Sequence, residues 1–134
     1  MFLHIYITKV IKNFSVWIQN LIILSDYIYM GYVYLIHDMY NDTYKIGVTK
    51  NLEKRMKALQ TGNTCELRLV ESFKTDYPYR LETMLHRSLE QYREKNEWFG
   101  LPIDIVYDFR SRCWQMNKII ESLKDNPYFS KNLK

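Results

Sequence analysis

The sequence predicts an α+β fold, and three observations carry that prediction. Two short runs rich in Val, Ile and Tyr, Tyr32–Ile36 and Thr43–Val48, flank a polar stretch of Asp and Asn residues, which is typical of a β-hairpin. A basic helix begins within a few residues of Gly47. A third strand-like run, Leu67–Phe73, follows that helix and precedes another helical pattern.

The boundaries of these elements are marked by capping and breaking residues. Thr49 or Asn51 is expected to cap the basic helix, because either side-chain oxygen accepts a hydrogen bond from a free backbone N–H. Gly62 is a natural helix stop. Pro78 suits a first helical turn, so the next helix is expected from about Tyr79 to Arg93.

The rest of the chain divides into three regions. Residues 1–29 form an apolar N-terminal extension, residues 30–101 a central domain, and residues 102–134 a C-terminal helical extension. The segment Asn96–Gly100 reads as a short buried return of the chain, and the apolar pattern after Pro102 is compatible with one or two closing helices.

The N-terminal extension is expected to be helical and not to span a membrane. Its longest uncharged run, Asn13–Ser25, is shorter than the roughly 20 residues that a spanning helix needs. No basic segment precedes the apolar part, so a signal peptide is not expected. Apolar residues recur at helical spacing, which favours a helix packed on the domain or paired with another chain: Ile11, Phe14, Ile18 and Leu21.

Composition and charge set limits on the class of partner and compartment. Aromatic residues make up 16% of the chain, with 12 tyrosines, and the net charge of +4 permits a polyanionic partner. The two cysteines, Cys65 and Cys113, lie far apart without metal-ligand spacing. They are expected to be reduced thiols of an intracellular protein, cytoplasmic or nuclear depending on the host.

The residues available for chemistry point to phosphodiester hydrolysis. The sequence has no Gly-rich phosphate loop, no paired Cys–His set and no serine-nucleophile motif. A tyrosine beside a cation serves as a general base toward water, and an arginine holds a phosphate through two parallel bonds. A single carboxylate suits a hydrated magnesium ion. The candidates are Tyr34, Arg55, Glu82 and His86.

Each of these residues also has a purely structural interpretation. Tyr34 fills a core equally well, Arg55 and Glu82 suit a solvated surface or an ion pair, and His86 suits the end of a packed helix. Three lysines on the basic helix and just before it, Lys50, Lys54 and Lys57, are available to DNA phosphates or to solvent alone.

The motifs around the hairpin resemble those of the GIY-YIG nuclease superfamily. The first motif stands as Gly31-Tyr32-Val33-Tyr34 and the second as Tyr44-Lys45-Ile46-Gly47, with Arg55 as the helix arginine. Further on, Leu81–His86 and Asn96–Phe99 look like the branch found in phages and large DNA viruses, which is often described as DNA-binding. The resemblance covers residues 31–100.

The resemblance implies a small three-stranded antiparallel sheet flanked by helices, which cuts DNA with one Mg²⁺ or Mn²⁺ ion. By position, Tyr34 would activate or orient the water, Arg55 would clamp the phosphate and Glu82 would bind the metal. Asn96 matches the phosphate-side asparagine, and His86 belongs to the branch's own motif. Lys45 departs from the pattern because it stands where many members have a second tyrosine.

The sequence therefore predicts a metal-dependent DNA endonuclease of viral, phage or mobile-element character. Lys45 in that setting either binds phosphate, or lowers the pKa of Tyr34, or marks a domain that binds DNA with weak or no cleavage. Tyr44 points to the other strand face and does not replace the missing tyrosine. A third alternative is an interaction protein whose apolar extension drives assembly.

Overall fold

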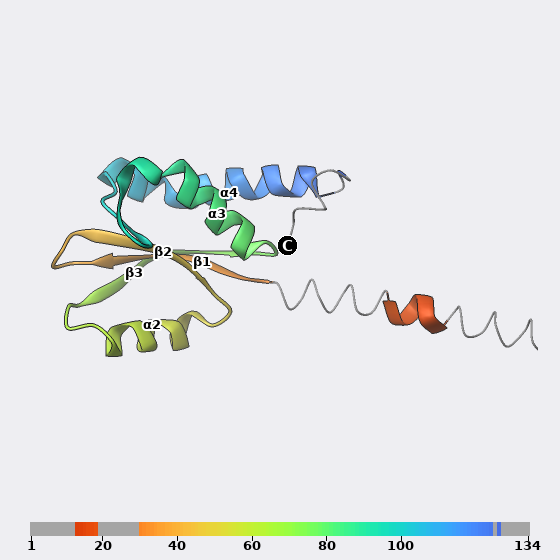
Figure 1. The fold of residues 1–134 in the computed structure, drawn as a ribbon, viewed down its shortest axis with the longest axis horizontal. Coiled ribbons are helices and arrows are strands. Elements are labelled where there is room, and N and C mark those ends of the chain that lie inside the picture. The colour runs from red at the N-terminus through yellow and green to blue at the C-terminus, as the bar shows by residue number, and fades with distance from the viewer. Residues whose placement is uncertain (1–12, 19–29, 125, 127–134) are drawn as a thin grey trace, which may run out of the picture.

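The computed structural model describes residues 13–18, 30–124 and 126 of the 134-residue chain. Residues 13–18 are helical. The expectations for the remainder of residues 1–29 and for the C-terminal tail lie outside the described residues. From residue 30 on, the chain begins with a hairpin and ends with a long helix (Figure 1). The elements follow in the order β1 (Gly31–Asp38), β2 (Thr43–Thr49), α2 (Leu52–Thr61), β3 (Leu67–Thr75), α3 (Pro78–Ser88), a 3₁₀ turn (Glu90–Tyr92), β4 (Arg93–Lys95), β5 (Trp98–Phe99) and α4 (Ile103–Leu123).

The α+β class is confirmed, but the prediction of a three-stranded sheet is wrong. The sheet has five strands in the order β3-β1-β2-β5-β4, and every neighbouring pair is antiparallel. The two additional strands, β4 and β5, are only three and two residues long. Strands of that length are too short to show an alternation of apolar and polar residues, so the sequence pattern did not reveal them.

The hairpin of β1 and β2 is confirmed, and its register fixes which side chains share a face. Tyr34 lies opposite Gly47, and Ile36 lies opposite Lys45. Because cross-strand partners point to the same face of a sheet, these four residues belong to one side. Tyr44 belongs to the other side, as expected, and stacks on His37 with ring centroids 4.4 Å apart.

Helix α2 begins and ends where its capping residues predict. Asn51 is the N-cap, and its side-chain oxygen accepts a hydrogen bond of 3.0 Å from the backbone N–H of Lys54. Gly62 follows the last turn and donates its N–H to the carbonyl of Ala58. Both predictions are confirmed, with Asn51 rather than Thr49 in the N-cap position.

Helix α3 starts at Pro78 as expected but ends at Ser88, so the helix predicted to reach Arg93 is too long. Leu89 terminates it with non-helical backbone angles, and its side chain is buried in the core. A 3₁₀ turn and β4 then take up the residues assigned to the last helical turn. Since no glycine or proline marks this end, burial of Leu89 rather than a local breaker decides it.

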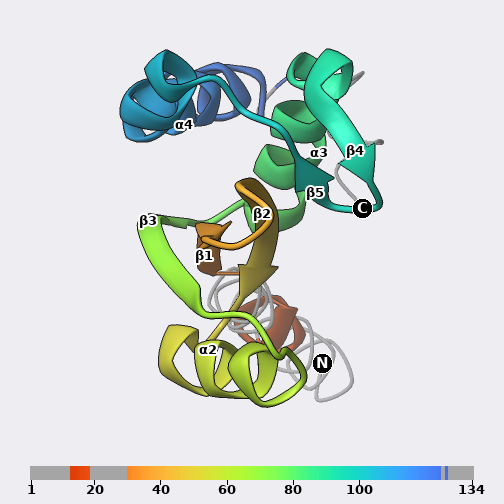
Figure 2. The ribbon, with the colours of Figure 1, turned by 90° about the vertical axis from the view of Figure 1, so that its left-hand side faces the viewer.

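The sheet lies between two helical layers, with α2 on one side and α3 and α4 on the other (Figures 1 and 2). The smaller buried cluster faces α2 and joins Tyr34, Ile36 and Leu67 to Leu52, Met56, Leu59 and Trp98. The larger cluster faces α3 and α4 and contains, among others, Val33, Leu35, Tyr44, Ile46, Leu81, Leu85, Phe99, Phe109, Cys113 and Ile120.

Helix α4 is a single helix of 21 residues, and its buried side chains belong to the larger core cluster. Cys113 lies in that cluster as a free, buried thiol, and Cys65 is also free. Burial raises the pKa of the Cys113 thiol to about 12. Among the described residues, none of the helices combines the length and apolar content needed to cross a bilayer.

Candidate nucleic-acid interface

The first feature of the site is the close contact of Tyr34 with Gly47 on the neighbouring strand. A Cβ atom added to Gly47 would lie 2.3 Å from the hydroxyl oxygen of Tyr34 and 2.6 Å from its Cζ. Only a glycine therefore lets the tyrosine ring lie across β2. Tyr34 is 1% exposed, so its ring is held inside the layer between the sheet and α2.

Arg55 joins α2 to this tyrosine. Its Nε donates a hydrogen bond of 3.3 Å to the hydroxyl oxygen of Tyr34. The hydrogen bond to Tyr34 and the nearby Glu97 carboxylate hold the pKa of Arg55 above its ordinary value, although partial burial acts in the opposite direction. The guanidinium stays charged and is half-buried at the edge of the helix, beside the sheet.

Lys45 is fixed by an ion pair with Glu97, from the turn between β4 and β5. Its Nζ donates to Glu97 Oε2 at 2.6 Å and lies 5.6 Å from the centre of the Trp98 ring. Only 12% of the Lys45 side chain is exposed. The backbone of Glu97 also accepts a hydrogen bond from the N–H of Ile46, which sets the position of the pair against β2.

Glu82 comes from α3, on the other side of the sheet, and the charges of Glu97 and Lys45 act on it. Burial and the neighbouring charge of Glu97 raise the pKa of Glu82 to about 7, although Lys45 acts to lower it. The ion pair of Lys45 and Glu97 thus acts on Glu82 through both of its charges. The described residues contain no group of three or more His, Cys, Asp or Glu side chains placed to hold a metal ion.

His86 and Asn96 make other contacts than the one between Tyr34 and Arg55. The Nε2 of His86 donates a hydrogen bond of 2.9 Å to the carbonyl oxygen of Ile46, and its ring leans on Phe99. His86 therefore ties α3 to β2. Asn96 occupies the β4–β5 turn with a φ of 54°, and its carbonyl accepts a hydrogen bond from Arg93.

The three lysines expected to contact DNA are exposed on the α2 side of the molecule. Lys50 lies in the turn before α2, and Lys54 and Lys57 lie on its outer surface. Lys57 pairs with Glu53 one turn earlier, at 3.7 Å between two largely exposed side chains. Such a pair is weak in water and yields readily to a phosphate.

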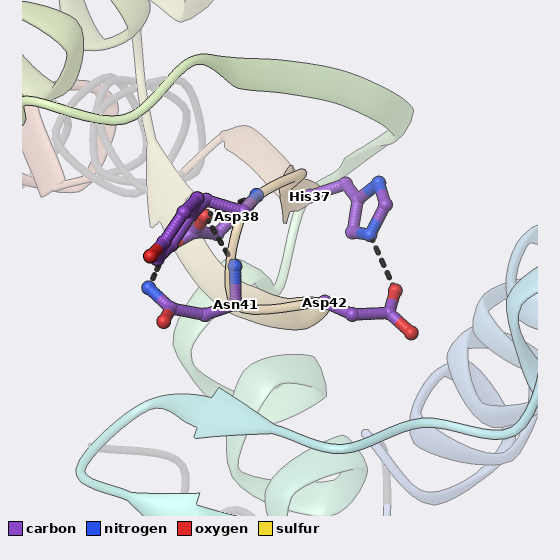
Figure 3. A network of polar contacts seen from close by, with 5 residues as sticks. His37, Asp38, Asn41 and Asp42 are labelled. Atoms are coloured by element: carbon purple, nitrogen blue, oxygen red, sulfur yellow. Dashed lines mark hydrogen bonds and ion pairs between the residues drawn. The ribbon is translucent and has the colours of Figure 1, made fainter.

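A second polar network holds the hairpin turn (Figure 3). Asp38 accepts hydrogen bonds from the backbone N–H groups of Tyr40 and Asn41 and from the side-chain amide of Asn41. Burial alone would raise the pKa of Asp38, but these hydrogen bonds outweigh it and lower the pKa. His37 and Asp42 form a further contact at 2.8 Å, and Asp42 has a φ of 53°.

The sequence did not predict Glu97 as a residue of the site, where it forms the ion pair with Lys45. It lies 52 positions from its partner Lys45, so no local spacing connects the two. The one signal was the Asn96-Glu97 dipeptide, because asparagine favours turns with positive φ. The predicted roles of Tyr34, Lys45, Arg55, Glu82, His86 and Asn96 stay predictions, and the geometry adds Glu97 to them.

Comparison with known families corrects the family inferred from the hairpin motifs. The family model that matches is that of the T5orf172 domain, over residues 31–114. The assignment to the GIY-YIG nuclease superfamily is therefore wrong as a family assignment. The matched range covers the sheet, α2, α3 and the first half of α4.

Two curated viral proteins are similar to this chain. The first, "Uncharacterized protein 460R" of Invertebrate iridescent virus 6, is 33% identical over 82 residues, which are 58% of this chain and 37% of the relative. The second, "Putative KilA-N domain-containing protein 315L" of the same virus, is 29% identical over 69 residues, or 49% of this chain and 30% of the relative. The chain thus spans about a third of the length of these relatives. No solved structure matches the chain significantly.

The viral character expected from the sequence agrees with both relatives. Of the two functions that the sequence left open for this fold, binding of DNA is better supported than its cleavage.

Proposed function

Since the chain belongs to the T5orf172 domain family, we propose that it is a DNA-binding module that holds the phosphate backbone against its α2 side. The family match carries this proposal. The exposed lysines Lys50, Lys54 and Lys57 support the choice of side, because phosphate contacts from lysine and arginine supply most of the sequence-independent affinity for DNA. Arg55, half-buried beneath them, adds a fixed positive charge.

The surroundings of Lys45 and Tyr34 favour binding over catalysis. Lys45 is engaged with Glu97, and Tyr34 is 1% exposed with its hydroxyl already accepting a hydrogen bond from Arg55. A general base has to reach the water from which it takes a proton. A side chain this deeply buried is better suited to packing α2 on the sheet and orienting Arg55 toward a phosphate.

Replacing Lys50, Lys54 and Lys57 together by alanine is expected to weaken DNA binding and its dependence on salt. The logarithm of affinity falls linearly with the logarithm of salt concentration, and each lost phosphate contact lowers the slope by about one. The measurement is fluorescence anisotropy of a labelled duplex titrated at several salt concentrations. The variant should show a slope smaller by about two to three.

Lys118→Ala is the matched control, since it removes the same charge from the exposed surface of α4 on the opposite side of the sheet. Lys118→Ala should change the slope of log affinity against log salt concentration by less than half as much as the loss of one of the lysines Lys50, Lys54 and Lys57 does. A triple variant that keeps the parental slope would place the DNA elsewhere on the surface. A parent protein that binds no duplex at low salt would refute the proposal itself.

A second candidate, metal-dependent hydrolysis of DNA, is favoured by the electrostatic interaction between the Glu82 and Glu97 carboxylates, because the charge of Glu97 also acts on Arg55. Carboxylates are the protein ligands that Mg²⁺ and Mn²⁺ prefer, and these ions take one or two of them while keeping several waters. Burial and, after it, the charge of Glu97 raise the pKa of Glu82, and a bound cation would favour its ionised form, so a cation is compatible with this carboxylate. A bound divalent ion would neutralise the phosphate, while Arg55 would position it.

Conversion of supercoiled plasmid to open-circular and linear forms tests this second candidate. If it holds, the parent cuts in millimolar Mg²⁺ or Mn²⁺, while Glu82→Gln and the chelator-treated parent bind the plasmid and leave it intact. Unchanged plasmid in the presence of either ion would remove hydrolysis as a function and leave DNA binding unaffected. Cutting that persists in Glu82→Gln would remove Glu82 from the mechanism.

A further inference from the structure

A polar recess of about 370 Å³ lies at the turn end of the hairpin. Five of its lining residues belong to four strands of the sheet, namely Asp38, Thr43, Glu94, Lys95 and Trp98, and Asn63 comes from the loop after α2. The full lining is Asp38, Asn41, Thr43, Asn63, Glu94, Lys95 and Trp98. The interface described above does not use this recess.

The recess opens on the same side of the sheet as α2. Asp38 pairs with Thr43, and Trp98 pairs with Lys45, whose side chain shares a face with Ile36 and therefore with the α2 cluster. Lys45 lies over the Trp98 ring. Trp98 thus links the charged cluster around Lys45 to the recess, and both face the proposed path of the DNA backbone.

The walls of the recess combine amides, a hydroxyl, an aromatic edge and charges of both signs. Asn41 is held in place because its Nδ2 donates a hydrogen bond of 2.8 Å to Asp38, which directs its Oδ1 away from the turn (Figure 3). Glu94 and Asp38 put two carboxylates into the lining, beside the ammonium group of Lys95. Carboxylates disfavour a phosphate at this point and suit groups that donate N–H.

We propose that this recess takes a single nucleobase that has left the stack of the bound DNA, an inference that rests on the DNA-binding function proposed above. Asparagine amides match the donor and acceptor edge of a base, and glutamate accepts from an exocyclic amino group. Trp98 supplies aromatic surface for contact with the ring of the base. The phosphates on either side of that base would then be attracted by Lys50, Lys54 and Lys57 on the α2 side.

The hairpin turn supports this role by presenting Tyr40 next to Asn41. Tyr40 is 84% exposed, although it sits in a turn held by the Asp38 network. An exposed aromatic ring on a rigid turn is suited to fill the space that an unstacked base leaves behind, as apolar wedges do in DNA-bending proteins. Its exposure also means that Tyr40→Ala leaves the core untouched.

The experiment compares two duplexes that differ only by one unpaired adenine, replaced by the fluorescent analogue 2-aminopurine for the spectroscopic measurement. Unpairing a base costs least where it is already unpaired, so the bulged duplex should bind more tightly. The parent is expected to prefer it by at least about fivefold, the lower limit for one good base contact. The 2-aminopurine fluorescence should change when the protein binds.

Asn63→Ala and Tyr40→Ala test the recess and the turn separately, with Gln115→Ala on the exposed surface of α4 as control. Both test variants should lose most of the preference while binding the fully paired duplex within about twofold of the parent, and the control should keep the preference. Equal affinity of the parent for both duplexes, or a preference that survives in both variants, overturns this inference alone. A parent that binds neither duplex overturns the DNA-binding function as well.

Discussion

Gly47→Ala is expected to destabilise the protein by about 3 kcal/mol, the upper part of the range for overpacking a well-filled site. The added methyl group would lie 2.3 Å from the Tyr34 hydroxyl oxygen and 2.6 Å from Cζ. The ring cannot move outward without separating α2 from the sheet, because Tyr34 packs in the cluster with Leu52 and Met56. Urea unfolding followed by circular dichroism measures the loss.

Gly62→Ala serves as the matched control. Gly62 has no neighbouring atom closer than 3.7 Å to an added Cβ, and its φ of −82° is open to alanine. It should therefore change the free energy of unfolding by less than about 1 kcal/mol. In a Tyr34→Leu background, which removes the clashing atoms, Gly47→Ala should cost much less. An equal cost in both backgrounds would show that the contact with Tyr34 is not the reason.

Glu82→Gln is expected to stabilise the protein at high pH and to have little effect at low pH. The folded-state pKa of Glu82 is raised to about 7 from an ordinary value of 4.5. A raised pKa means that the folded state holds the proton more tightly, so its contribution to stability is complete below pH 4.5 and is lost as the pH rises through 7. The neutral glutamine does not suffer that loss.

The difference between variant and parent should grow from near zero at pH 4.5 to about 3 kcal/mol at pH 8.5. Urea unfolding at these two pH values measures it, and comparison with the parent cancels the other titrating groups. Glu53→Gln, on the exposed surface of α2, should shift stability by less than about 0.5 kcal/mol at either pH. If the difference in the free energy of unfolding between Glu82→Gln and the parent is the same at both pH values, the carboxylate of Glu82 is solvated and its pKa is not raised.

Local sequence patterns predicted the elements that are decided locally. The hairpin follows from alternating Val, Ile and Tyr around a turn of Asp and Asn, and the ends of α2 follow from Asn51 and Gly62. The end of α3 did not follow, because burial of Leu89 fixes it and no breaking residue marks it. Tertiary packing overrides helix propensity at such positions.

The candidate site was predictable only in part for the same reason. Tyr34 and Arg55 were singled out, and the structure brings them into contact. The partner of Lys45 was not found, since Glu97 is 52 residues away, in the turn between two strands that are too short to leave a pattern. The contact of Tyr34 with Gly47 depends on cross-strand register, which the length of the turn sets and composition does not reveal.

The rate at which the buried thiol of Cys113 is alkylated measures how often the core of the protein opens. Cys113 has no accessible surface and belongs to the core cluster shared by the sheet, α3 and α4. A thiol with a pKa of about 12 is almost entirely protonated near neutral pH, and the protonated form does not react with alkylating reagents. Modification of Cys113 therefore requires separation of α4 from the sheet, and the rate of modification depends on how often this separation occurs. Cys65 is half-buried in the loop before β3, so its alkylation needs only local motion of that loop. The ratio of the alkylation rates of Cys65 and Cys113 therefore distinguishes local opening of this loop from unfolding of the whole domain.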